Sequence, residues 1–209
     1  MIEPSPSSIR SAVESVLAEP LPAIVQVGHP VLRRPAVPYD GQLDDTVLDA
    51  LLKLMRRVMH AAPGVGLAAP QLGIPLRLAV LEDRYEVSPE VASTRQREQL
   101  DFLAVINPAY RSLDGGTAAF YEGCLSFAGY QAVVERHRRV ELTYQRADGV
   151  RADVELSGWQ ARIAQHETDH LDGTIYIDKA LSRSLCSNAE YAHRWTQPDI
   201  TRARAELGF

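Results

Sequence analysis

This chain of 209 residues has few cysteines and carries no net positive charge. Only Cys124 and Cys186 occur, which excludes a disulfide framework as the basis of the fold and favours a reducing compartment. The net charge of -5 and the pI of about 5.7 offer no broad basic surface for a nucleic acid, although a local basic patch stays open. We therefore expect a cytoplasmic protein without a direct nucleic-acid site.

Long apolar runs are also missing. Residues 58–76 carry no formal charge, but Gln71 and six helix-breaking residues interrupt them, namely Pro63, Gly64, Gly66, Pro70, Gly73 and Pro75. Such a stretch is typical of a loop that leads into a strand and not of a membrane helix. The first residues contain neither a basic region nor an apolar run, so no targeting segment is indicated.

Helical periodicity occurs in three places. Residues 7–18 repeat apolar side chains on one face before two prolines, and residues 44–60 do so more strongly, with acids at the start and arginines at the end. Residues 158–171 form the third predicted helix, with Ser157 and Gln160 as an expected capping box and Gly173 just beyond its end.

The middle of the chain is rich in predicted strands. The strand candidates are residues 76–81, 102–106, 118–121, 130–134, 139–144 and 150–156, with a hairpin turn at 147–149. Residues 82–101 are highly charged and are expected to be an exposed loop or insertion, and the tail from 182 to 209 is expected to lie along the surface. These elements indicate one α+β domain over 1–209, with a core at about 25–180.

The clearest chemical signal is His166-Glu167-Thr168-Asp169-His170. Residues four apart lie one above the other on a helix, so His166 and His170 can bind one metal ion. Glu167 would then lie next to a water at the metal and could act as its general base. The two histidines share a helix face with Trp159 and Ile163, which indicates that this face points into the protein.

A catalytic metal of this kind needs a third protein ligand. The pattern of one protease class continues through Gly173 but requires a histidine where this chain has Tyr176. Glu190 and Glu206 lie downstream without a convincing helical context. Upstream, Cys124 follows a strand candidate within Glu122-Gly123-Cys124-Leu125-Ser126, and a thiolate is a strong ligand for zinc or ferrous iron.

The segment from Gly64 to Gly73 contributes a third motif, Gly-Val-Gly-Leu-Ala-Ala-Pro-Gln-Leu-Gly. Its glycines do not fit a dinucleotide fingerprint, and no strand precedes them. Its small residues allow the backbone to approach a ligand closely, and the Gln71 amide could donate to an oxyanion. A simple tight turn into the next strand is the alternative interpretation.

Together and in this order, the three motifs resemble the peptide deformylase family. The resemblance implies that Cys124, His166 and His170 bind the metal, that Glu167 is the general acid and base, and that Gln71 and the Leu125 N–H hold the oxyanion. It matches Gly66 to the position whose backbone meets the substrate and Arg136 to a family arginine near the active site. Val65 and Ile163 are expected to line an apolar pocket for the methionine side chain of the substrate. The fold implied is a single domain of antiparallel sheets packed around the metal-binding helix.

The implied activity is the hydrolytic removal of the formyl group from N-formyl-methionyl nascent peptides, with release of formate. The implied cofactor is one divalent metal ion, Fe2+ in the cell, which Zn2+, Ni2+ or Co2+ can replace in purified protein. A monomer without membrane contact, with transient ribosome association, is expected. Glu122 is expected to form a structural ion pair with a nearby arginine.

The chain departs from the family pattern at several points. Ala128 stands where a proline is usual, residues 82–101 are longer than the common form, and both ends differ. Two other functions remain as alternatives. A zinc endopeptidase requires another downstream ligand, and a non-catalytic peptide-binding metalloprotein requires a fourth protein ligand.

Overall fold

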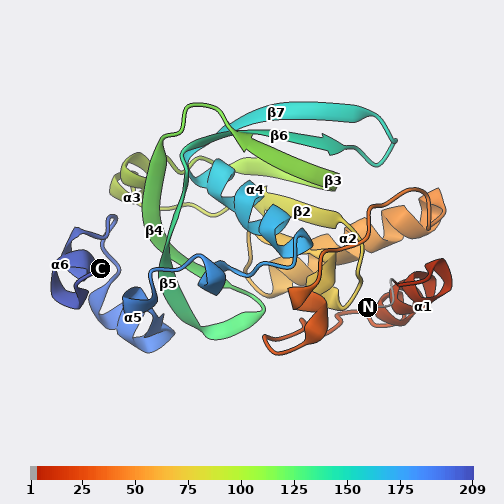
Figure 1. Ribbon diagram of the computed structural model, residues 1–209, viewed down its shortest axis with the longest axis horizontal. Helices are drawn as coiled ribbons and strands as arrows, with labels where there is room; N and C mark the ends of the chain where they lie inside the picture. Colours follow the sequence, from red (N-terminus) through yellow and green to blue (C-terminus); the bar gives the residue numbers. More distant parts are fainter. Residues whose placement is uncertain (1–3) are drawn as a thin grey trace.

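The computed structural model describes residues 4–209 and has an α+β architecture built from two antiparallel sheets (Figure 1). The larger sheet has the order β1-β2-β3-β6-β7, and the smaller has the order β4-β5-β8. The strands are β1 (Gly66–Ala68), β2 (Leu78–Asp83), β3 (Leu100–Ser112), β4 (Thr117–Cys124), β5 (Phe127–His137), β6 (Arg139–Gln145), β7 (Arg151–Ser157) and β8 (Cys186–Ser187). The α-helices are α1 (Pro6–Leu17), α2 (Asp45–Ala61), α3 (Pro89–Arg95), α4 (Gly158–Leu171), α5 (Asn188–Arg194) and α6 (Thr201–Leu207).

Helix α4 lies at the centre of the molecule, as Figure 1 shows. It contacts every strand of the larger sheet and also β5 of the smaller one. Its apolar residues Ala161, Ile163, Ala164 and Leu171 are buried in one cluster with residues of the larger sheet. A helix enclosed on both sides can carry polar groups only where these have partners or a chemical role. The expected fold of antiparallel sheets around a central helix is confirmed.

Helix α2 covers the other part of the core. Asp44 caps its first turn by accepting from the Val47 N–H at 3.0 Å, and Leu51, Leu54 and Met55 are buried on its inner face. Helix α1 packs against α2 through its own buried Ile9 and Val13. Both helices were predicted from periodicity, and both begin and end within two residues of the expected bounds.

The interpretation of residues 82–101 as an exposed loop is only partly right, because Arg84, Glu86 and Gln99 are exposed but other parts of the segment are buried or helical. Glu82 and Asp83 are buried at the end of β2, and residues 89–95 form α3. The segment packs on the start of α4, where a Cβ added to Gly158 would lie only 2.3 Å from the Gln96 carbonyl oxygen. Glycine at position 158, with a φ of +54°, allows this approach. Charge misled the sequence interpretation, because Asp83 is neutralised by Arg97 in the fold.

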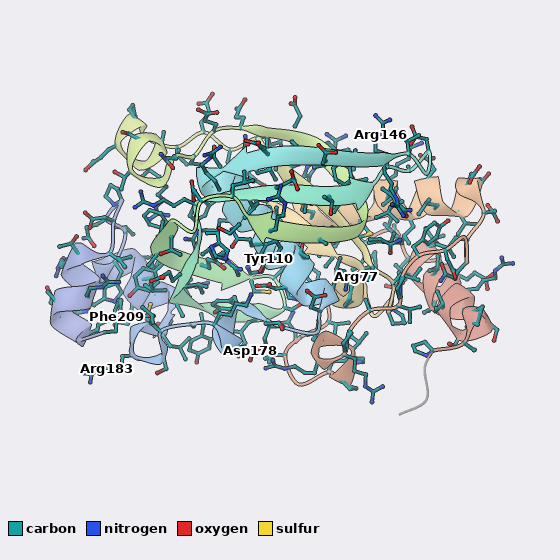
Figure 2. The ribbon with its side chains drawn as sticks, turned by 45° about the horizontal axis from the view of Figure 1, so that its top comes forward. Arg77, Tyr110, Arg146, Asp178, Arg183 and Phe209 are labelled. Carbon is teal, nitrogen blue, oxygen red and sulfur yellow. The ribbon has the colours of Figure 1, made fainter. Side chains whose placement is uncertain are left out.

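Two further expectations are corrected. Ser157 is the N-cap residue of α4, but its side chain accepts no capping hydrogen bond. The C-terminal tail does more than lie on the surface, since β8 pairs with β5, and Trp195 and Ala203 form a small core with Tyr121 and Val133. Figure 2 shows Arg183 and Phe209 near each other in this region, where Arg183 Nε donates to the Leu207 carbonyl at 2.8 Å. Within residues 4–209, no helix combines the length and apolar character needed to cross a membrane.

Candidate metal centre

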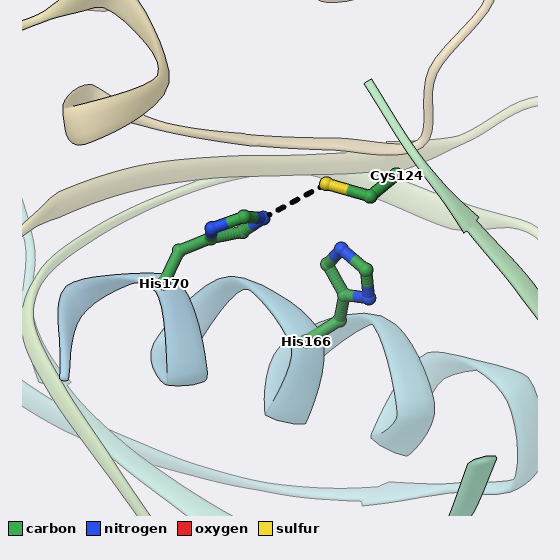
Figure 3. Close-up of side chains that lie close together, drawn as sticks. All are labelled: Cys124, His166 and His170. Atoms are coloured by element: carbon green, nitrogen blue, oxygen red, sulfur yellow. Dashed lines mark hydrogen bonds between the residues drawn. The ribbon is translucent and has the colours of Figure 1, made fainter. Parts of the chain in front are cut away.

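Three side chains meet where the end of β4 passes over α4. Cys124 Sγ lies 3.2 Å from His170 Nε2, and the potential ligand atoms of Cys124, His166 and His170 all lie within 4.8 Å of one another (Figure 3). The histidines are one helical turn apart, which brings both rings to the same side of α4. The structure therefore brings together the three metal ligands expected from sequence.

This set of donors fits one metal ion. A thiolate and two imidazoles are ligands that suit zinc and ferrous iron. Ligand bonds of about 2.0–2.3 Å place the donors of a tetrahedral site roughly 3.3–3.8 Å apart, close to the 3.2 Å between Cys124 Sγ and His170 Nε2. Among residues 4–209 this is the one such cluster of three potential ligands. Three protein ligands are typical of a catalytic site and not of a closed structural one.

His166 is oriented by a buried carboxylate. Its Nδ1 lies 3.0 Å from Glu122 Oε2, which leaves Nε2 for the metal side. Arg136 binds the same carboxylate through two hydrogen bonds of 2.6 and 3.0 Å, and Arg162 adds a third at 2.5 Å. Although burial opposes ionisation, these arginines and the His166 bond hold the pKa of Glu122 well below its usual range. The expected ion pair of Glu122 is present, with two arginines.

Arg136 also reaches a second carboxylate. Its Nη1 donates to Asp169 Oδ2 at 2.8 Å, while Lys179 and Tyr110 donate to Asp169 Oδ1 at 2.7 and 3.1 Å. Figure 2 shows Tyr110 beside the C-terminal half of α4. The network connects β4, β5 and β3 to the ligand-bearing helix, so the orientation of His166 is fixed from several elements at once.

The two histidines have different electrostatic environments. Burial, together with the nearby charges of His166 and Arg136, lowers the pKa of His170 well below its usual range, so its ring is neutral as a metal ligand requires. Burial acts in the same direction on His166, but hydrogen bonds with Cys124 and Glu122 raise its pKa to about 10. A proton and a metal ion therefore compete for this ring.

Glu167 lies beside the ligands and is itself buried. Its Oε2 has no hydrogen-bond partner among the described residues, and burial raises its pKa to about 7 despite the opposing charges of His166 and Arg136. A Cβ added to Gly66 would lie 2.2 Å from Glu167 Oε1. Gly66 is thus required for the side chain of Glu167 to occupy this position, a role that the sequence did not predict.

Gln71 points its amide nitrogen towards the centre. Its Oε1 accepts from the Ala68 N–H at 2.8 Å, which fixes the direction of the amide group. Its Nε2 lies 3.2 Å from Ser126 Oγ and 3.7 Å from Cys124 Sγ. A donor held in this way is available to a negatively charged oxygen formed next to the metal.

A short N-terminal segment, residues 25–27, connects the Gln71 region to the loop after Cys124. The Val25 N–H donates to the Gln71 carbonyl at 2.8 Å, and the Val27 N–H donates to the Ser126 carbonyl at 2.8 Å. Between them, Gln26 Nε2 donates to the Leu125 carbonyl at 3.0 Å, and its Oε1 accepts from the Ala128 N–H at 3.3 Å. Sequence reasoning missed Gln26, although the replacement of the usual proline by Ala128 pointed to an extra N–H that needs a partner.

A cavity of about 920 Å³ opens beside the metal centre. Val65, Gly66, Gln71, Leu125 and the ligand-bearing face of α4 line it. Arg136, expected at the substrate, is not part of the lining, because it is 3% exposed and lies behind Glu122 and Asp169.

Tyr176, which stands in the position of a protease's third histidine, is not placed as a ligand. Its ring stacks on His166 with centroids 6.1 Å apart, and its hydroxyl donates to the Tyr130 carbonyl at 3.2 Å. Glu190 and Glu206 form ion pairs with arginines of their own short helices. Neither of the downstream acids joins the metal centre, which removes the ligand set that an endopeptidase of that kind requires.

Fold and site together define a class, a metal-dependent hydrolase with one metal ion. The family model described as "Polypeptide deformylase" matches residues 21–185. Peptide deformylase 3 of Streptomyces avermitilis is 54% identical over 199 residues, which cover 94% of this chain and 88% of that protein. The crystal structure of peptide deformylase from Thermotoga maritima is 36% identical, with a TM-score of 0.65 over 77% of this chain and 97% of that one. A Met-Ala-Ser-bound class I type b peptide deformylase from Acinetobacter baumannii is 28% identical, with a TM-score of 0.69 over 76% and 98%.

The chain belongs to the polypeptide deformylase family. It is an enzyme that removes the N-formyl group from nascent peptides in a metal-dependent hydrolysis.

Proposed function

We propose that Cys124, His166 and His170 hold the metal ion, that Glu167 is the general acid and base, and that Gln71 and the Leu125 N–H hold the oxyanion. The observation that carries this assignment is the meeting of the three ligand atoms within 4.8 Å, beside a cavity that is lined by Cys124, His166, Glu167 and Gln71. The family's reaction needs these groups next to one formyl carbon.

The metal ion, when bound, supplies a Lewis acid that polarises the formyl carbonyl and makes a water more acidic. Glu167 accepts the proton of the attacking water, whose oxygen forms a bond to the formyl carbon. Gln71 Nε2 and the Leu125 N–H donate to the carbonyl oxygen as it becomes negative. The carbon–nitrogen bond then breaks, and Glu167 returns the proton to the leaving nitrogen. The products are formate and a peptide with a free amino terminus.

Substrate recognition follows from the lining of the cavity. Val65 and Ile163 offer apolar surface for the methionine side chain, and the Gly66 backbone is open to the peptide. The Acinetobacter baumannii relative binds Met-Ala-Ser, and we propose that formyl-Met-Ala-Ser occupies the same cavity here. Arg136 contributes indirectly, because it holds the Glu122 carboxylate that orients His166.

We propose Fe2+ as the metal in the cell, supported by the family resemblance, with Zn2+, Ni2+ or Co2+ as replacements in purified protein. The thiolate and two imidazoles suit these metals rather than Mg2+ or Ca2+. Since nascent peptides are the substrates, we place the enzyme in the cytoplasm as a monomer that associates transiently with the ribosome.

The experiment is formate release from formyl-Met-Ala-Ser, with elemental analysis of protein purified without oxygen. Cys124→Ala is expected to lose both metal and activity, whereas Cys186→Ala, the matched control, keeps both. Glu167→Ala is expected to retain metal while kcat falls by about 10²–10⁴-fold. Near-normal turnover of Glu167→Ala, or full metal content of Cys124→Ala, would contradict the assigned roles.

A further inference from the structure

A second, smaller hollow lies between α3 and the first turn of α4, and we call it the α3–α4 pocket. Its volume is about 130 Å³, and its walls include Ser93, Arg95, His137, Arg138 and Arg162. Among the residues that the structure describes, no aspartate or glutamate lines this pocket. Three arginines without a lining carboxylate make this a strongly positive enclosure.

Arg95 is the central observation. It is 9% exposed, and its guanidinium lies over the rings of Phe120 and Trp159, at 5.7 and 5.5 Å from their centroids. Its Nε and Nη2 donate only to the carbonyls of Pro198 and Gln197, at 2.9 and 3.2 Å. Within residues 4–209 it forms no ion pair with a carboxylate. A buried cation without a counter-charge is costly, and a bound anion would remove that cost.

The neighbouring charges do not supply the missing anion. Arg162 shares the carboxylate of Glu122 with Arg136. Burial, and the charges of Arg136 and Arg95, lower the pKa of Arg162 despite its bond to Glu122. Arg138 is exposed, donates through Nε to the Thr117 carbonyl at 2.7 Å, and has no carboxylate partner in the described part of the chain. Positive charge therefore exceeds negative charge around the pocket.

Two further features favour an anion there. The pocket touches the N-terminal turn of α4 at Gly158, where the helix dipole is positive, although the Gly158 and Trp159 N–H groups themselves donate to the Arg138 and Gln96 carbonyls at 2.8 and 3.2 Å. His137, which also lines the pocket, has a buried Nδ1 without a partner among the described residues. The volume of about 130 Å³ is well above the roughly 10–15 Å³ that one water needs, so a small polyatomic anion fits.

We propose that the α3–α4 pocket binds one small oxyanion, of which inorganic phosphate is the type, between Arg95, Arg138 and Arg162. The site adjoins the large cavity, since Arg95 and Arg162 line both hollows, whereas His137 and Arg138 line only the α3–α4 pocket. Free phosphate is one source of such an anion, and formate, which the enzyme itself produces, is another. Both present negatively charged oxygens that accept hydrogen bonds from arginine. The proposal gives residues 82–101 a role, because α3 supplies one wall of the site.

The test is calorimetric titration of the metal-loaded enzyme with inorganic phosphate at low ionic strength, in a buffer without other oxyanions. One saturable site in the millimolar range or below is expected. Arg138→Gln is expected to weaken binding by about tenfold or more, as loss of one charge-assisted hydrogen bond does. Arg139→Gln is the matched control, since this adjacent arginine pairs with Glu155 and Asp114 outside the pocket.

Thermal unfolding provides a second readout, because an anion that binds only the folded state raises the unfolding temperature. This rise is expected in the parent and in Arg139→Gln, and is expected to shrink in Arg138→Gln. Arg95→Lys keeps the charge but loses the planar fork, so it also weakens binding if it folds. A parallel titration with formate distinguishes the sources, and Arg138-dependent binding of either ion supports the site.

Two results would overturn the proposal. One is the absence of saturable binding for both phosphate and formate across the millimolar range. The other is binding that Arg138→Gln leaves unchanged and that a product peptide in the large cavity displaces, because the anion would then lie at the metal centre. Both results are independent of deformylase activity, which is measured separately.

Discussion

Replacing Gly66 with alanine tests the placement of the catalytic glutamate most directly. The new Cβ would lie 2.2, 2.5 and 2.6 Å from the Oε1, Cδ and Cγ atoms of Glu167. Gly66 has no left-handed φ that would make alanine strained by itself, and the three atoms nearest to the new Cβ all belong to Glu167. Overpacking of this kind costs about 1–3 kcal/mol of stability. Displacement of the general base is expected to reduce kcat by about 10²-fold or more.

The assay is formate release, with the metal content measured on the same sample. The metal content is expected to stay unchanged. Gly123→Ala is the control, because its Cβ would meet nothing closer than Gln131 Cγ at 3.6 Å. In a Glu167→Ala background the contact is absent, so Gly66→Ala is expected to cost little further stability or activity. A Gly66→Ala enzyme with kcat close to the parent would refute the reasoning. An equal loss of activity when Gly66→Ala is made in the parent and in Glu167→Ala would also refute it, since the methyl group would then act on the substrate.

Three other perturbations have expected outcomes. Glu122→Gln leaves buried Arg136 without its full counter-charge, so urea unfolding is expected to show a loss of stability of about 3–5 kcal/mol. Competition with a chelator is expected to show metal binding that is about 10–100-fold weaker. Unchanged stability together with unchanged metal affinity would contradict the role of Glu122. Gln26→Ala removes the clamp on the Leu125 loop, and kcat is expected to fall by about 2–12-fold with KM nearly unchanged; a change confined to KM would instead indicate a substrate contact. The hydrogen bond from Arg56 first, and that with His60, outweigh burial and hold the pKa of Glu82 below its usual value. The stability that Glu82 contributes is therefore present above about pH 4.3 and is lost as the pH falls through its lower folded pKa. Urea unfolding measures the free energy of unfolding at about pH 7 and at about pH 3. The difference between these two free energies is expected to be smaller for Glu82→Gln than for the parent.

Much of the fold was predictable, because its elements carry local signals. The helices at 6–17, 45–61 and 158–171 and the six longer strands all lie where periodicity placed them. The strands β3, β4 and β5 are longer than expected, most of all β3, which extends over Leu100–Ser112 with a change of register between Ile106 and Ala109. Alternation in the sequence does not report how far a neighbouring strand continues to offer hydrogen bonds. Helix α3 was missed because its one buried charged residue, Arg95, finds its hydrogen-bond partners at Gln197 and Pro198 only in the folded chain.

The sequence by itself determined the chemistry of the candidate site. Spacing of four residues sets His166 and His170 on one helix face, and Glu167 follows the first histidine whatever the rest of the chain does. Cys124 and Gln71 could be added only through the joint resemblance of three motifs.

Tertiary structure alone decided what surrounds these groups. Glu122 lies 44 residues from His166 in the sequence, and Gln26 lies 99 residues from Leu125. No local pattern encodes such pairs, because they depend on how sheets and helices pack. The same packing places Gly66 against Glu167 and moves Arg136 from the substrate to a buried ion pair. It also leaves Arg95 buried without a carboxylate, since its surroundings come from α3, β4, α4 and the tail.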